Sequence, residues 1–175
     1  MKITFIGTGK MGGALMERLL STGFVSKEQL LACDVNEGRL NELRQKLGVN
    51  VSLDNRKGAR FGDVVIIAVM LKQVRGVLEE IRTEILESKI IVSVAAVVPT
   101  TLIENMLTKK AGVVRIMPNI PSLVGSSFNL ICFGRFMKDE DKEQIRKMLS
   151  IWGDYREVDE EKMELYTDFT RSSPP

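Results

Sequence analysis

The chain contains no histidine, and its two cysteines, Cys33 and Cys132, lie far apart in the sequence. A zinc site draws several ligands from Cys, His and carboxylate side chains, usually with short spacings between them. The sequence has no such spacing, so we expect no metal. Both cysteines stand in apolar stretches, where we expect them to pack as small buried side chains with free thiols, and free thiols suit a reducing compartment.

The sequence also lacks long apolar runs and blocks of like charge. The N-terminal apolar run meets glycine after about four residues, too few for a signal-peptide core, and no segment approaches the ~20 apolar residues of a membrane span. The 25 basic and 23 acidic residues are interspersed and give a net charge of +2, which offers no basic surface for a nucleic acid. We therefore expect a cytoplasmic protein with neither a membrane nor a nucleic-acid partner.

What is present is the composition of a globular protein, with 44% hydrophobic and 27% charged residues in a chain of 175. Apolar runs alternate with stretches of helical periodicity. We expect strands at 3–6, 30–33, 49–53, 63–69, 89–94, 112–117, 128–133 and 155–158, and helices at 10–20, 37–47, 72–87, 99–107, 140–150 and 159–169. This alternation predicts an α/β fold, a Rossmann-type doubly wound and mostly parallel sheet with helices on both faces.

A glycine-rich turn follows the first strand. Gly7-Thr8-Gly9-Lys10-Met11-Gly12 reads G-x-G-x-x-G and opens a helix, the context in which this motif holds the pyrophosphate of a dinucleotide. Gly7 permits the tight turn, Gly9 lets the backbone approach the pyrophosphate, and Gly12 lets helix and strand pack closely. The alternative is a turn with a structural role only.

Asp34 ends the second strand, where an acidic side chain can accept hydrogen bonds from the adenine ribose hydroxyls. In that role it repels a 2′-phosphate and favours NAD over NADP, although Arg39 and Lys10 could accommodate a phosphate. The alternative is a turn residue or helix cap. We leave the choice between NAD and NADP open.

Four stretches together resemble pyrroline-5-carboxylate reductase. The opening 3–20 is similar to that family's FIGxGxMGxAxxxGL, and Asp54-Asn55 followed by 63–69 to its DN and DVVxLAV. Ser93-Val94-Ala95-Ala96 is similar to SIAA. The most specific stretch, 113–125, resembles VVRxMPNxPxxVG.

The resemblance implies hydride transfer from a reduced nicotinamide to the C=N bond of a cyclic imine, in proline synthesis. It also implies roles for particular residues. Gly7 to Met11 hold the pyrophosphate, Asn55 the adenosine, and Ala68 and Val69 the nicotinamide ribose, while the nicotinamide and substrate pocket is shaped by Met117, Pro118, Asn119, Val124 and Gly125. No residue is singled out as an acid or base.

Departures from the family pattern leave alternatives open. Met70-Leu71-Lys72 replaces KPQ, Val97 replaces the glycine of AAG, and Arg171 stands where SGSGP has a glycine. We expect a dinucleotide-binding domain over 1–158, with 159–175 beginning a helical domain that is otherwise absent, and a homo-oligomer formed through that last helix. The alternatives to the reductase are an inactive dinucleotide-binding module or regulatory subunit, and a reductase of another imine or carbonyl compound.

Overall fold

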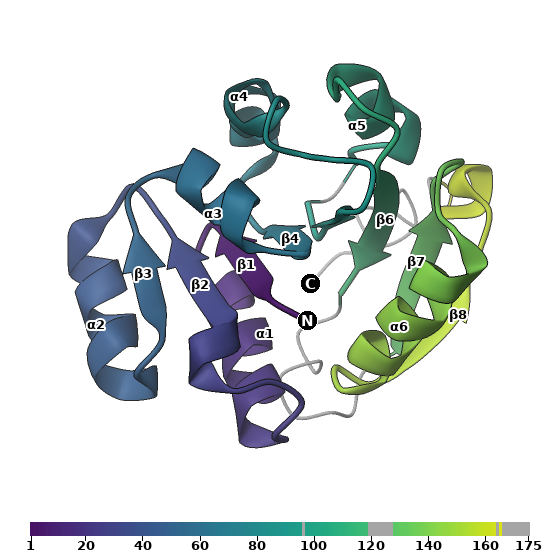
Figure 1. Ribbon diagram of the computed structural model, residues 1–175. Helices are drawn as coiled ribbons and strands as arrows, with labels where there is room; N and C mark the ends of the chain where they lie inside the picture. The colour runs from purple at the N-terminus through teal and green to yellow at the C-terminus, as the bar shows by residue number, and fades with distance from the viewer. Residues whose placement is uncertain (96, 119–127, 164, 166–175) are drawn as a thin grey trace, which may run out of the picture.

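The structure, a computed structural model, describes residues 1–95, 97–118, 128–163 and 165. Its centre is one eight-stranded sheet in the order β3-β2-β1-β4-β5-β6-β7-β8 (Figure 1). Six strands run parallel to one another, and β7 pairs antiparallel with β6. The strands are β1 Ile3–Ile6, β2 Leu30–Cys33, β3 Asn50–Ser52, β4 Val64–Ile67, β5 Ile90–Ser93, β6 Gly112–Met117, β7 Phe128–Phe133 and β8 Asp154–Glu157.

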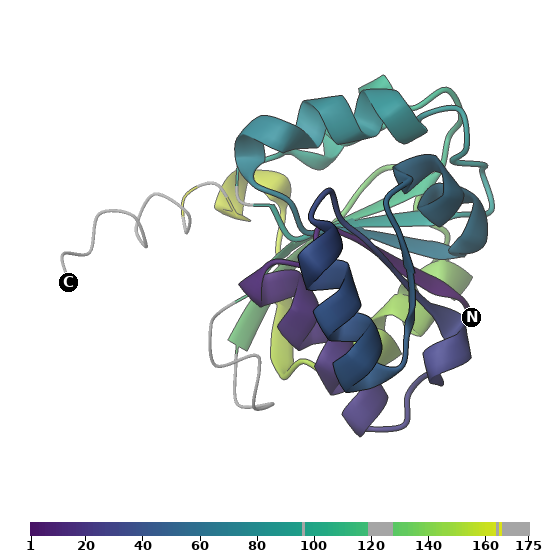
Figure 2. The same ribbon diagram turned by 90° about the vertical axis from the view of Figure 1, so that its left-hand side faces the viewer.

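Helices cover both faces of this sheet, as the sequence predicts. They are α1 Lys10–Ser21, α2 Glu37–Leu47, α3 Asn55–Phe61, α4 Leu71–Ile81, α5 Thr100–Met106 and α6 Asp139–Ser150, with a short 3-10 helix η1 at Lys27–Gln29. Figure 2 shows α4 on one side of the sheet and α1 and α2 on the other. None of the described helices combines the length and the apolar character that crossing a bilayer requires.

Two apolar layers hold the helices on the sheet. Alternate residues of each central strand point to opposite faces, so Phe5 packs toward α1, α2 and α6 while Ile6 packs toward α3, α4 and α5. Because both faces are covered, β1, β2, β4 and β5 are buried at every position. This explains why their sequences read as continuous apolar runs.

The structure corrects several predicted boundaries. The sequence analysis overlooked η1 and α3, and it extended α4 to residue 87, whereas the helix ends at Ile81. Asn36 caps α2 by accepting a hydrogen bond from Arg39 N–H (3.1 Å), and Gly48 ends that helix at φ +69°, which agrees with the predicted range 37–47.

A third, smaller apolar cluster lies at the β7 end of the sheet. A helical turn at 160–163, yellow in Figure 1, follows β8. It places Met163, fully buried, against Leu130 and Cys132, so this residue of the predicted helix 159–169 packs within the chain. Leu165 is 61% exposed, and the rest of that predicted helix lies outside the described residues.

Candidate functional site

The glycine loop connects β1 to α1, where three strand ends meet. Gly7 N–H donates to Cys33 O at the end of β2 (2.9 Å), and Ala68 N–H, after β4, donates to Ile6 O (2.8 Å). Gly7 has φ +91°, and a Cβ atom there would lie 2.6 Å from Ala68 O. The turn therefore requires glycine at this position, as predicted.

Gly9 and Gly12 meet different surroundings. A Cβ atom on Gly12 would collide with Gly7 O and lie 3.1 Å from Ala68 Cβ, so α1 packs on the loop as closely as the motif implies. A Cβ atom on Gly9 would meet nothing within 4 Å. Gly9 is also the N-cap of α1, without a side-chain capping bond and without an acid in the first turn. The positive end of this helix thus faces open space, which suits an anionic ligand.

Asp34 is held by the glycine loop. Its Oδ2 atom accepts hydrogen bonds from Thr8 N–H (2.7 Å) and from the Thr8 hydroxyl (2.8 Å), and Oδ1 accepts one from Asn36 N–H (3.0 Å). Partial burial acts to raise the pKa of Asp34, but these hydrogen bonds outweigh burial and lower the pKa below its ordinary value. The carboxylate is therefore charged at neutral pH.

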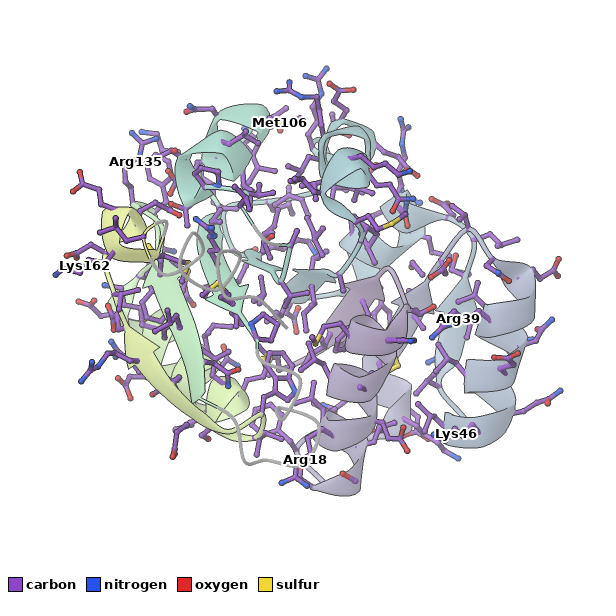
Figure 3. All side chains as sticks on the ribbon, turned by 180° about the vertical axis from the view of Figure 1, so that it is seen from behind. Arg18, Arg39, Lys46, Met106, Arg135 and Lys162 are labelled. Carbon is purple, nitrogen blue, oxygen red and sulfur yellow. The ribbon has the colours of Figure 1, made fainter. Side chains whose placement is uncertain are left out.

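Of the two cations considered for a phosphate, only Arg39 lies beside Asp34. Its side chain extends between α2 and α1 (Figure 3), and its Nε donates to Thr8 O. Lys10 is exposed and lines the other side of the glycine loop. The carboxylate of Asp34 and the guanidinium of Arg39 thus lie side by side at the end of the site that is farther from Lys10.

Two clefts run from the glycine loop. One, of about 370 Å³, extends past Asp34 and Asn55, and the other, of about 430 Å³, extends past Met117 and Pro118. They share Gly9, Ala68, Val69 and Met70, so together they cross the carboxyl ends of β1 and β4. These strands flank the point at which strand order reverses, where open α/β sheets bind ligands.

Most of the predicted site residues are brought together here. The first cleft contains Gly7, Gly9, Asp34, Asn55, Ala68 and Val69, and the second contains Gly9, Lys10, Met11, Ala68, Val69, Met117 and Pro118. Thr8 is buried beneath the loop and Gly12 behind it, so both shape the loop without lining a cleft. Asn119, Val124 and Gly125 lie outside the described residues.

Sequence reasoning missed several lining residues of the first cleft. Val35, 81% exposed, and Met70, 60% exposed, offer apolar surface there, and Gln73 lies on the first turn of α4. Asn55 Nδ2 donates to Glu80 Oε2 (2.8 Å), so α4 fixes its orientation. An apolar residue just after the end of a predicted strand could have indicated a lining residue of the cleft. Val35, directly after Asp34, is such a residue.

Val97 departs from the family pattern and has an unusual backbone. It adopts φ +64°, the only described non-glycine residue with a positive φ. This region is strained for a β-branched side chain, and the related family has glycine there. Val97 follows Val94 and Ala95, which line the second cleft.

Comparison with known proteins identifies the family. Residues 2–97 match the model of the family described as NADP oxidoreductase, coenzyme F420-dependent. The chain belongs to this family.

In the described part of the chain, no three His, Cys, Asp or Glu side chains gather closely enough to hold a metal ion.

Several similar proteins are reductases of the kind that the motifs indicate. A pyrroline-5-carboxylate reductase of Methanosarcina acetivorans is 38% identical over 99% of this chain and 64% of its own length. The solved pyrroline-5-carboxylate reductase of Coxiella burnetii aligns with a TM-score of 0.82 at 30% identity, over 90% of this chain and 58% of that one. The resemblance predicted from the sequence is thereby confirmed.

A third relative was solved with a dinucleotide. The pyrroline carboxylate reductase of Plasmodium falciparum, with NADP bound, aligns with a TM-score of 0.85 at 25% identity, over 97% of this chain and 62% of that one. The chain thus spans about three fifths of the length of these relatives.

Proposed function

We propose that this chain binds NAD(H) or NADP(H) and forms the cofactor-binding part of a reductase of cyclic imines, with pyrroline-5-carboxylate as the first candidate substrate. The observation that carries the proposal is the junction of two clefts at Gly9, in front of the uncapped N-terminus of α1. A dinucleotide has this shape, with two arms that meet at a doubly charged pyrophosphate.

The orientation of the dinucleotide follows from the lining of each cleft. The adenosine arm would lie in the first cleft, where Asp34 can accept from ribose hydroxyls and Val35 and Met70 offer apolar surface to the base. The nicotinamide arm would lie in the second cleft, against Val94, Ala95, Met117 and Pro118. Asn119, predicted to contact the cofactor, and Val124 and Gly125, predicted for the substrate pocket, lie outside the described residues and stay predictions.

When bound, the reduced nicotinamide supplies the hydride that converts a C=N bond to an amine. The chain's own residues bind and orient: the glycine loop fixes the pyrophosphate, and the apolar lining of the second cleft keeps water from one face of the ring. A protonated imine is already electrophilic, so hydride transfer needs little further acid catalysis, consistent with a chain that has no histidine.

Calorimetry with NADH and NADPH tests the cofactor assignment. Gly9→Val fills the space in front of α1 without meeting any protein atom within 4 Å of its Cβ, so the variant should fold and lose binding. Gly76→Val is the matched control, because Gly76 also has open space around its Cβ and lines neither cleft. Equal binding by wild type and Gly9→Val, or none by wild type, contradicts the proposal.

Oxidation of the bound reduced cofactor distinguishes the reductase from the alternatives. Turnover with pyrroline-5-carboxylate supports the first candidate, turnover only with other imines or carbonyl compounds reassigns the substrate, and binding without turnover favours a binding module or regulatory subunit.

We propose two further features from single observations. The two buried free thiols suit a cytoplasmic location, and cell fractionation tests this.

The exposed side chain of Leu165 suits contact with a second copy of the chain. Leu165→Lys should then lower the molecular mass that light scattering measures.

A further inference from the structure

Glu160 is the first residue of the helical turn after β8, and its carboxylate bridges two other elements. Oε2 accepts hydrogen bonds from the backbone N–H (2.9 Å) and the hydroxyl (2.6 Å) of Thr100, the first residue of α5. Oε1 pairs with Arg115 Nη1 (2.5 Å) on β6. The Arg115 side chain is 1% exposed and the Glu160 side chain 25%, so a buried guanidinium pairs with a partly exposed carboxylate.

Each partner of Glu160 belongs to a segment that also lines the second cleft. Thr100 closes the β5–α5 connection, which begins with the cleft residues Val94 and Ala95. Arg115 precedes Met117 by two residues on β6, so both point to the same face of the sheet, and Met117 and Pro118 form the opposite wall of the cleft. One carboxylate thus ties together the two chain segments that form the proposed nicotinamide site.

The turn that carries Glu160 also supports one wall directly. Met163 packs on Leu130 and Cys132, and Met117, the strand partner of Leu130, packs against the same cluster. Residues 160 and 163 lie one helical turn apart and so face the sheet together. The turn at 160–163 therefore reaches the cleft residue Met117 through the Met163 cluster, and Glu160 on the same turn pairs with Arg115, two residues before Met117.

We propose that Glu160 is a positioning residue for the nicotinamide end of the site, holding the start of α5, which follows Val94 and Ala95, and the end of β6 at a fixed separation through Thr100 and Arg115. The residue does not line the second cleft. It acts through the two segments that do, so its loss changes the nicotinamide environment and leaves the adenosine cleft as it was. This inference rests on the proposed function.

Glu160→Gln keeps the size of the side chain and removes its charge, and Thr100→Val removes only the hydroxyl donor while Glu160 and Arg115 stay paired. The Gln variant leaves Arg115 buried without its carboxylate, which destabilises a fold, so circular dichroism accompanies every measurement. Glu143→Gln is the matched control, because it breaks an exposed pair with Arg146 on α6, far from the cleft.

The measurement compares a whole cofactor with its adenosine half. NADPH and 2′-phospho-ADP-ribose are titrated into each variant, and the fluorescence of the reduced nicotinamide is recorded. We expect Glu160→Gln to weaken NADPH binding by about tenfold, to shift the bound emission toward that of free NADPH, and to leave binding of the half-molecule unchanged. Thr100→Val should move the emission in the same direction by less, and Glu143→Gln should match wild type.

The outcomes separate the two proposals. If wild type binds neither compound, and neither NADH nor ADP-ribose, the proposed function fails and takes this inference with it. If wild type binds only NADH, the same comparison is made with NADH and ADP-ribose. If wild type binds both and the emission of the Glu160→Gln and Thr100→Val complexes equals that of wild type, only the positioning role is overturned. Equal weakening of both compounds in a folded variant also overturns it, because the effect would then not be confined to the nicotinamide end. A Glu160→Gln chain that fails to fold leaves the decision to Thr100→Val.

Discussion

The carboxylate of Asp34 accepts both the backbone N–H and the hydroxyl hydrogen of Thr8, which ties the end of β2 to the glycine loop after β1. One side chain therefore does two things. It fixes the conformation of the glycine loop, and it places a negative charge in the cleft that we propose for the adenosine arm.

Replacing Asp34 should alter both cofactor choice and overall affinity. Wild type should bind NADH more tightly than NADPH, because the carboxylate repels a 2′-phosphate. Asp34→Ser should narrow or reverse that preference. It should also lower the affinity for both cofactors, because the hydrogen bonds from Thr8 that hold the glycine loop are lost. Calorimetry with both cofactors measures this, and Thr8→Val serves as the control that removes one hydrogen bond but no charge. A clear NADPH preference in wild type would show that Arg39 dominates.

Gly7→Ala should destabilise the fold where Gly9→Ala does not. An alanine at φ +91° is strained by ~1–2 kcal/mol, and its Cβ would also overlap Ala68 O. Gly9 has φ −55° and open space around it. Urea unfolding of the two variants compares these costs, and equal midpoints would mean that the loop relaxes around the new methyl group.

Val97→Gly should stabilise the protein slightly. Removing the side chain relieves ~1–2 kcal/mol of left-handed backbone strain and costs ~0.5–1 kcal/mol in added freedom of the unfolded chain. The net gain in free energy of unfolding should therefore be small and positive. Val98→Gly, at a buried neighbour, should be destabilising. Thermal melts of both variants measure the change in stability. A loss of stability in Val97→Gly as large as that in Val98→Gly contradicts the expectation.

The stability of the protein should fall in acid through Glu160. Burial acts to raise the pKa of Glu160, but the hydrogen bonds from Thr100 and the pairing with Arg115 lower it overall below the ordinary 4.5. The unfolded chain then binds the proton more readily, so this contribution is complete above pH 4.5 and is lost as the pH falls toward the folded-state pKa. The gap in free energy of unfolding between wild type and Glu160→Gln should shrink from pH 7 to pH 4. A constant gap would show that the pKa of Glu160 is the same in the folded and the unfolded chain.

Both thiols should be inert while the protein is folded. Burial raises the pKa of Cys33 and of Cys132 to about 12, with nearby carboxylates adding to the effect. At pH 8 roughly one thiol in ten thousand is then ionised, and thiolate is the reactive form. A disulfide reagent should label the cysteines only in urea, and rapid labelling of the native protein would contradict their burial.

The central strands were predictable because burial on both faces leaves a plain apolar signature, and α2 because Asn36 and Gly48 mark its ends. Helix α3 gave no such signal. Its buried residues are Gly58 and Ala59, and a Cβ atom on Gly58 would meet Cys33 Sγ at 2.6 Å. A helix that packs through glycine and alanine has no apolar stripe. For α4, the fully buried Ile85 beyond the helix end extended the apparent periodicity.

The site was predictable as far as the motifs reached. The glycines and Asp34 were identified from their positions relative to strands, which the sequence marks. The pairing of Asp34 with Thr8, the separation of Arg39 from Lys10, and the bridge from Glu160 depend on how side chains from distant segments meet. Glu160 looks like one of several surface acids in the sequence, and the helix expected at 140–150 begins one residue earlier, at Asp139.

The single tryptophan links the first helix of this protein to a segment far along the chain. Trp152, directly after α6, donates its indole N–H to Leu15 O in α1 (3.1 Å), across 137 positions of chain. Helix α1 therefore completes its surroundings only after residue 152 has been synthesised. We expect residues 2–97, although they carry the glycine loop, to be less stable alone than within the chain, and the docking of the segment that carries α6 to be a late step of folding, reported by the emission of that one indole.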